Sequence, residues 1–356
     1  MPSSGPVVTR CPHPLAALRG WSTGHGNPVR PRGRCAQGVI VVGQVRGAGS
    51  VVDEAAVAAR EALIAECRAT LSALPADSAF SHVTAARLLG LPMSYAMEED
   101  ARLHVMRPIA NNRVRLPGIA GHRALHARHV IDVEGVPVVG LADTWVDLGE
   151  MVGRGKPVGL DDLVVLGDAC ATRLDSRTPL MQSCLRRNRP RGKRTLLEAY
   201  EEIRVGSASP RESLARLVLT RGGLPEPRLN EPIYASWDRT VLLGVGDLVW
   251  RVPAVDGTVV KVVGEYQGEL YHSDEDQRTA DGHRRGGLEA DGWDVQEIWN
   301  ADLNGSLSRR DTLQRFADAL HVPHEALRPA DVEARFFSRH AIDVAIQRQM
   351  LRSARA

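Results

Sequence analysis

Two β-branched runs joined by a short turn constrain the fold of this chain more than any other feature. The first run spans residues 246–250, the second spans 258–266, and Asp256-Gly257 between them is a turn signal. The pattern predicts an antiparallel hairpin. A helix is expected before it, and a helix around 281–288 and a strand at 293–298 are expected after it.

The helix before the hairpin carries its own start signal. Ser209 is a favourable N-cap residue, Pro210 suits the first helical position, and Glu212 at the third position completes a capping box. Local capping alone therefore accounts for Glu212, unless another carboxylate lies across from it.

The hairpin brings acidic residues together. Alternation along the second strand places Lys261, Glu265 and Gln267 on one face, and Asp247 begins the neighbouring strand. Antiparallel pairing brings Asp247 and Glu265 within a few ångströms, and two carboxylates beside a polar side chain suit Mg²⁺. The alternative is that Asp247 caps a turn and Glu265 faces solvent.

The length of 356 residues, with 43% hydrophobic and 25% charged residues, is enough for two or three packed domains. Residues 1–50 contain six arginines, nine glycines and six prolines but no acid, which predicts a poorly ordered leader. Residues 51–185 are expected to be an α+β region. It has helices at 53–74, 141–152 and 160–173, and strands at 103–105, 113–116, 129–133 and 136–139.

The remaining boundaries follow from charge and helical spacing. Residues 186–206 are expected to form a basic linker and helix, 207–305 a second domain, and 306–356 a helical, basic extension. Six of the nine residues from 186 to 194 are basic, among them Arg189 and Arg191. This segment is either a solvated linker or a loop that contacts phosphates.

Composition excludes several classes of protein. The chain has 42 arginines, three lysines and 43 acids, so its net charge of +2 argues against a uniformly positive surface, and codon bias is the simpler explanation of the arginine excess. Aromatic residues make up 4%, which disfavours a single-strand binder. Five scattered cysteines and the lack of a long apolar run predict a cytoplasmic protein without membrane spans.

At this point a resemblance becomes specific. The ordered set formed by Asp247, Glu265-Tyr266-Gln267-Gly268, His272, Asp281-x-x-Arg284 and Gly292-Trp293 resembles the C-terminal domain of unknown function related to Vsr endonucleases, within the PD-(D/E)XK restriction-endonuclease-like superfamily. The resemblance implies a three-layer α/β/α domain with a mixed central sheet. It also implies a Mg²⁺-dependent DNA endonuclease.

The resemblance implies a role for each matching residue. Asp247 and Glu265 become the metal carboxylates, and Glu212 becomes a candidate third acid. Gln267 falls where the superfamily usually has a catalytic lysine and the nearer family an Asp; a glutamine can orient water but supplies no positive charge. His272 becomes a general base or phosphate ligand, against the simpler interpretation of a surface histidine. For the remaining basic residues, phosphate contacts compete with salt bridges; these residues are Arg278, Arg284 and Arg285.

A second resemblance lies upstream. Phe80-Ser81-His82, Leu103-His104-Val105, Gly121-His122-Arg123 and Ala142-Asp143-Thr144-Trp145 resemble AbiEi-like abortive-infection antitoxins. In that family a winged helix precedes these segments, where this chain has its acid-free leader. The pair of resemblances leaves two functions open, an endonuclease linked to defence or a catalytically weak DNA-binding regulator or antitoxin-like protein with a cognate toxin or defence partner.

Overall fold

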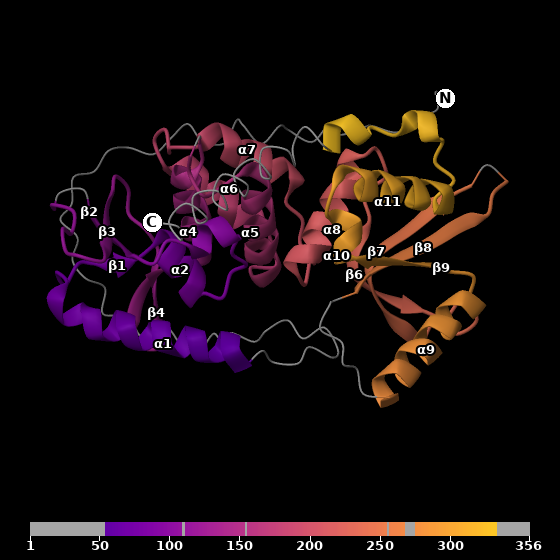
Figure 1. The fold of residues 1–356 in the computed structure, drawn as a ribbon, viewed down its shortest axis with the longest axis horizontal. Coiled ribbons are helices and arrows are strands. Elements are labelled where there is room, and N and C mark those ends of the chain that lie inside the picture. The colour runs from indigo at the N-terminus through magenta and orange to yellow at the C-terminus, as the bar shows by residue number, and fades with distance from the viewer. Residues whose placement is uncertain (1–53, 109–110, 154, 255, 268–274, 333–356) are drawn as a thin grey trace, which may run out of the picture. The chain divides into compact units, whose positions relative to one another are not determined.

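The computed structural model describes residues 54–108, 111–153, 155–254, 256–267 and 275–332 (Figure 1). The leader of residues 1–50, His272 and the part of the C-terminal extension after Val332 lie outside this description. The described residues form a mixed α+β fold with two β-sheets, which confirms the α+β expectation at the level of class. No helix among them is long and apolar enough to cross a membrane.

The first sheet is mixed, with strand order β3-β2-β1-β5-β4. Its strands are β1 (Ala79–Phe80), β2 (Leu103–Pro108), β3 (Ile119–Ala124), β4 (Val130–Val133) and β5 (Val136–Val139). Strands β1 and β2 are antiparallel, as are β4 and β5, whereas β2 pairs with β3 and β1 pairs with β5 in parallel. The strands expected at 103–105, 129–133 and 136–139 are confirmed.

The strand expected at 113–116 is wrong: these residues form no strand, and β3 is the edge strand beside β2. A Cβ placed on Gly121 of β3 would lie 2.1 Å from the Val114 carbonyl oxygen, so the Val114 backbone packs directly against β3. Val114 is buried by this contact. The burial of Val114 therefore reflects packing on β3 and not strand pairing.

Helices pack around the first sheet. They are α1 (Glu54–Thr70), α2 (His82–Leu88), α3 (Tyr95–Glu98), α4 (Leu141–Leu148), α5 (Leu160–Arg173), α6 (Thr178–Arg186) and α7 (Lys193–Glu202). Their core includes the fully buried Phe80, Trp145 and Leu163. Helix α5 has the predicted bounds, and it begins where Asp162 Oδ2 accepts a hydrogen bond from the Gly159 backbone N–H. Helix α7 adds Leu196 to the same core.

The second sheet has the order β6-β7-β8-β9. Its strands are β6 (Arg228–Tyr234), β7 (Leu242–Pro253), β8 (Val259–Gln267) and β9 (Asp294–Trp299). The first three strands are antiparallel, which confirms the predicted hairpin, and β9 lies parallel to β8 after helix α9 (Glu275–Ala290).

Helices cover both faces of the second sheet (Figure 1). On one face lie α8 (Pro210–Arg221), α10 (Asn300–Leu303) and α11 (Ser306–Ala319). Their side chains, such as Phe316, pack on Val262 and Ile298 of the sheet. On the other face Leu288 of α9 packs with Val249 and Val263.

A buried ion pair joins the two cores where α5 meets α8. Arg216 Nη2 donates to Asp168 Oδ2 at 2.9 Å, and the two side chains are 1% and 0% exposed. Asp168 also accepts hydrogen bonds from Ser213 Oγ and from the Arg204 backbone N–H, both at 2.7 Å. Apolar packing crosses the same contact, since Val165 of α5 belongs to the second core and Leu217 of α8 to the first.

Removal of Asp168 from this pair leaves the buried charge of Arg216 without one of its partners. We expect Asp168→Ala to lower the free energy of unfolding by about 3–5 kcal/mol, because Arg216 stays buried with Glu226 as its remaining carboxylate partner and Ser213 loses its acceptor. Urea denaturation measures the loss. The matched control is Arg228→Ala, which removes an ion pair of an exposed arginine and is expected to cost less than about 1 kcal/mol. A loss of similar size in both variants would show that the buried pair contributes no more to stability than an exposed one.

Candidate functional site

Asp247 and Glu265 lie on the adjacent strands β7 and β8. The antiparallel register pairs Leu248 with Gly264, and Asp247 and Glu265 are the next residues beyond this pair. The Tyr266 backbone N–H donates a 2.8 Å hydrogen bond to Asp247 Oδ2. Glu265 is close enough to Asp247 to contribute to the rise in the Asp247 pKa.

Negative charge is concentrated around Asp247. Burial raises its pKa to about 7, and the carboxylates of Glu212 and Glu265 add to the rise. The Tyr266 hydrogen bond and the Arg284 guanidinium oppose it without cancelling it. Asp247 therefore holds a proton more tightly than an ordinary aspartate, and a cation beside it would relieve the repulsion.

Glu265 is buried and paired with an arginine from α9. Arg284 Nη2 forms an ion pair with Glu265 Oε2, and Arg284 Nη1 donates to the Val245 carbonyl at 3.0 Å. The aliphatic part of Arg284 passes over Gly244, where a Cβ would lie 3.0 Å from Arg284 Cδ. Of the arginines expected to contact nucleic acid, this one reaches the acidic pair.

Glu212 is held by its helix cap. Its Oε2 accepts hydrogen bonds from the Ala208 N–H at 2.9 Å and from Asn230 Nδ2 at 2.7 Å, and its own N–H donates to Ser209 Oγ at 3.2 Å. The Ser209 N-cap is confirmed, but the reciprocal bond of the capping box is not formed, because the Glu212 carboxylate accepts from the Ala208 N–H instead of the Ser209 N–H. Glu212 is close enough to raise the Asp247 pKa, but Glu212, Asp247 and Glu265 are not among the sets of described side chains whose ligand atoms all lie within 4.8 Å of one another.

The lysine nearest in sequence does not substitute for Gln267. Gln267 ends β8 and is half-buried. Lys261 lies further back along the strand, where its Nζ donates to the Asp291 carbonyl at 2.8 Å and lies 3.2 Å from Asp291 Oδ2. Among the described residues the positive charge beside Glu265 therefore comes from Arg284.

The other expected site residues lie apart from the acidic pair or outside the described residues. His272 and the side chain of Arg278 belong to the latter group. Arg285 pairs with Glu289 at 2.9 Å and with Glu297 at 2.6 Å, so the salt-bridge interpretation describes it in this structure.

The basic segment of residues 186–194 contains one buried arginine, and its other basic residues are exposed. Arg187 is buried, where it donates to Asp147 Oδ1 at 2.5 Å and to Asp143 Oδ1 at 2.9 Å. Arg189 and Arg191 are exposed, and Arg191 lines a pocket on the first sheet. The segment is thus anchored by Arg187, and its other four arginines are exposed.

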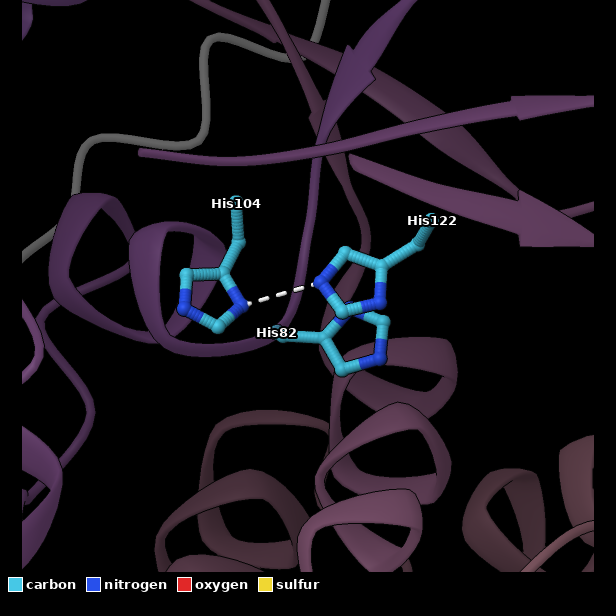
Figure 2. A group of neighbouring side chains, drawn as sticks. All are labelled: His82, His104 and His122. Carbon is cyan, nitrogen blue, oxygen red and sulfur yellow. Dashed lines mark hydrogen bonds between the residues drawn. The ribbon is translucent and has the colours of Figure 1, made fainter. Parts of the chain in front are cut away.

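One cluster had no role in the sequence-based interpretation. His82, His104 and His122 form the one set of three His, Cys, Asp or Glu side chains in the described part of the chain whose ligand atoms all lie within 4.8 Å of one another. Figure 2 shows the three rings facing one another. Burial lowers the pKa of each, that of His122 to about 4, so the rings are neutral at pH 7. A signal was present, since the sequence places the three histidines in short segments of the same α+β region.

The chain matches no protein-family model, no curated protein and no solved structure. What the acidic site can do therefore follows from its chemistry. Two adjacent carboxylates, a third acid nearby and an arginine at the edge can bind a hard cation and an anionic group next to it.

Because the pKa of Asp247 is raised in the folded chain, ionisation of this carboxyl group lowers the stability of the fold. Asp247 binds its proton more tightly in the folded chain, with a pKa of about 7, than in the unfolded chain at about 3.9, so its effect is to lower stability as pH rises from about 4 to 7. Asparagine stays neutral and keeps an acceptor for Tyr266. We expect Asp247→Asn to be more stable than the parent at pH 8, on the order of 2 kcal/mol, and the gain to shrink at pH 5.

Urea denaturation at the two pH values measures this difference. The control is Glu289→Gln, which changes an exposed carboxylate and is expected to show no gain that depends on pH. A loss of stability in Asp247→Asn at pH 8 would contradict the crowding of charge at this site.

Proposed function

We propose that residues 207–305 form a restriction-endonuclease-like domain that hydrolyses phosphodiester bonds in DNA with Mg²⁺ held by Asp247 and Glu265. The supporting observation is the position of these carboxylates on two paired strands of a mixed sheet that helices cover on both faces. The Vsr-like motifs point to the same residues.

The donor set fits the ion. Mg²⁺ in proteins is usually bound by one or two carboxylates and keeps several waters, so Asp247 and Glu265 suffice without Glu212. When bound, such an ion lowers the pKa of an attacking water and stabilises charge on a phosphoryl oxygen. The high pKa of Asp247 is the expected state of this carboxylate without a cation.

The remaining groups have positional roles. Arg284 reaches the acids from α9, so its guanidinium is placed to bind a phosphate oxygen when Glu265 engages a cation. Asn230 and the α8 cap hold Glu212, which keeps a third negative charge near Asp247. Gln267 can orient a water by hydrogen bonding, but it contributes no charge.

Plasmid cleavage tests the proposal directly. With Mg²⁺ present, we expect the purified chain to nick or cut plasmid DNA and expect Asp247→Ala and Glu265→Ala each to reduce the rate by about a hundredfold or more, since each removes a carboxylate of the cation site. Glu289→Ala is the matched acidic control and is expected to retain activity. Cleavage that persists in both site variants would refute this site.

A second candidate function is DNA binding without catalysis, as in a regulator or an antitoxin-like protein with a toxin or defence partner. One observation favours it: Glu265 pairs with Arg284 while Glu212 is held by Ala208 and Asn230, so protein groups already compensate these acids. Binding that weakens steeply with salt, without cleavage, would support this function.

The glutamine at the end of β8 discriminates the two functions. In an enzyme, Gln267→Lys supplies the positive charge that Gln267 lacks, and we expect the cleavage rate to rise about tenfold or more. In a non-catalytic binder the same change tightens DNA binding and produces no cutting. Gln267→Met, which has no charge, is the control, and the initial rate of plasmid nicking is the measurement.

A further inference from the structure

The three histidines come from separate segments that the first sheet brings together. His82 begins α2, His104 lies on β2 and His122 lies on β3 (Figure 2). The parallel register pairs His104 with Ala120 and Met106 with His122, so both histidines point to the same face. His122 Nε2 lies 3.1 Å from His104 Nδ1, and the His82 and His122 rings stack with centroids 3.8 Å apart.

A carboxylate orients His104. Asp100 Oδ2 lies 3.0 Å from His104 Nε2, and Arg102 pairs with the same carboxylate, which keeps the pKa of Asp100 well below its usual value. An ionised Asp100 accepts a hydrogen bond from the Nε2–H of His104. The lone pair of His104 is then on Nδ1, which faces His122. A carboxylate behind a histidine is the usual outer support of a metal-binding imidazole.

His82 is buried although one of its two ring nitrogens has no hydrogen-bond partner among the described residues. Its ring is 1% exposed, its Nδ1 lies 2.9 Å from Ser81 Oγ, and its Nε2 has no hydrogen-bond partner among the described residues. A buried polar atom without a partner costs about 1–3 kcal/mol. His82 also has a φ of +49°, a left-handed conformation that side chains rarely adopt. Both features destabilise the fold locally, yet the fold keeps this imidazole beside the other two.

A pocket gives solvent and solutes access to the cluster. Its volume is about 570 Å³, and the three histidines are part of its lining. Five cationic side chains also line it: Arg102, Arg113, Arg115, Lys156 and Arg191. The acids of the lining are Asp100, which pairs with Arg102, and Glu150, whose pKa burial raises. The pocket therefore favours an anion.

We propose that His82, His104 and His122 bind a divalent transition metal of the zinc type, and that the remaining coordination position faces the cationic pocket and takes a phosphate oxygen. Three imidazole nitrogens with one open position are a donor set that zinc accepts, with Zn–N distances of about 2.0–2.1 Å. Nitrogens bound to one such ion lie roughly 3.3 Å apart, close to the 3.1 Å between His104 and His122. His82 completes the set by rotating its ring within the cluster.

Metal binding by the full chain tests the site. After dialysis against a chelator, we expect one equivalent of Zn²⁺ to bind, measured by competition with a chromogenic chelator, and the thermal midpoint to rise. Because the chain has 12 histidines, the variants decide the assignment. His104→Gln and His122→Gln are expected to lose this equivalent, and His324→Gln, which changes an exposed histidine, to retain it. Equal stoichiometry in all four proteins would overturn the proposal, as would no binding by the parent.

A milder variant guards against loss of the fold. Asp100→Asn leaves all three imidazoles in place, and we expect it to weaken Zn²⁺ binding about tenfold or more by releasing the orientation of His104. Circular dichroism confirms that each variant is folded. An unchanged affinity in a folded Asp100→Asn protein would contradict the role of Asp100 in orienting the ligand.

Cobalt reports the open position. Co²⁺ bound by three imidazoles in a four-coordinate site gives intense visible absorption bands, and we expect inorganic phosphate to shift them as it enters the fourth position. We expect Arg191→Gln to weaken the phosphate response, since it removes one pocket cation. Weak bands typical of six-coordinate cobalt, or bands that phosphate does not move, would refute the open site.

Discussion

The buried ion pair between Asp168 and Arg216 fixes how the two cores meet. A carboxylate that is 0% exposed is stable as an ion only when strong donors surround it, and Asp168 has three: Arg216, Ser213 and the Arg204 N–H. Two of these come from α8. Ser213 directly follows Glu212 on α8. The hydrogen bond that anchors α8 to the first core therefore also fixes the position of Glu212, whose carboxylate raises the pKa of Asp247.

The acidic site shows how stability and chemistry compete on one sheet. Glu212 satisfies its helix start and stays held there, while Asp247 is left near two other acids with a raised pKa. A neutral residue at Asp247 would suit the fold better, and residues that oppose stability in this way concentrate at functional sites. Arg284 offsets part of the charge at Glu265. It comes from α9, which follows the hairpin in the chain, so no local sequence pattern requires this ion pair.

Local signals predicted local structure well. The α8 cap, the bounds of α5 and the pairing of β7 with β8 each depend on residues close in sequence, and all are confirmed. The strand expected at 113–116 failed because Val114 packs across Gly121, a contact that strand propensity does not encode. The partners of Arg187 and Arg284 and the gathering of the three histidines depend on which strands and helices become neighbours, which the order of elements alone leaves open.

The histidine cluster and the acidic pair offer different donor atoms, so the two sites would bind different metal ions. Carboxylate oxygens favour Mg²⁺, whereas imidazole nitrogens favour zinc-type ions, so neither donor set competes well for the other's metal. Charge separates them further. A cation at the acidic pair neutralises existing negative charge, but a dication among three neutral imidazoles adds charge to a pocket that five cationic side chains already line. Asp100 offsets only part of it. The histidine site therefore needs an anion as its fourth ligand, and the arginines of the pocket are placed to hold that anion in turn.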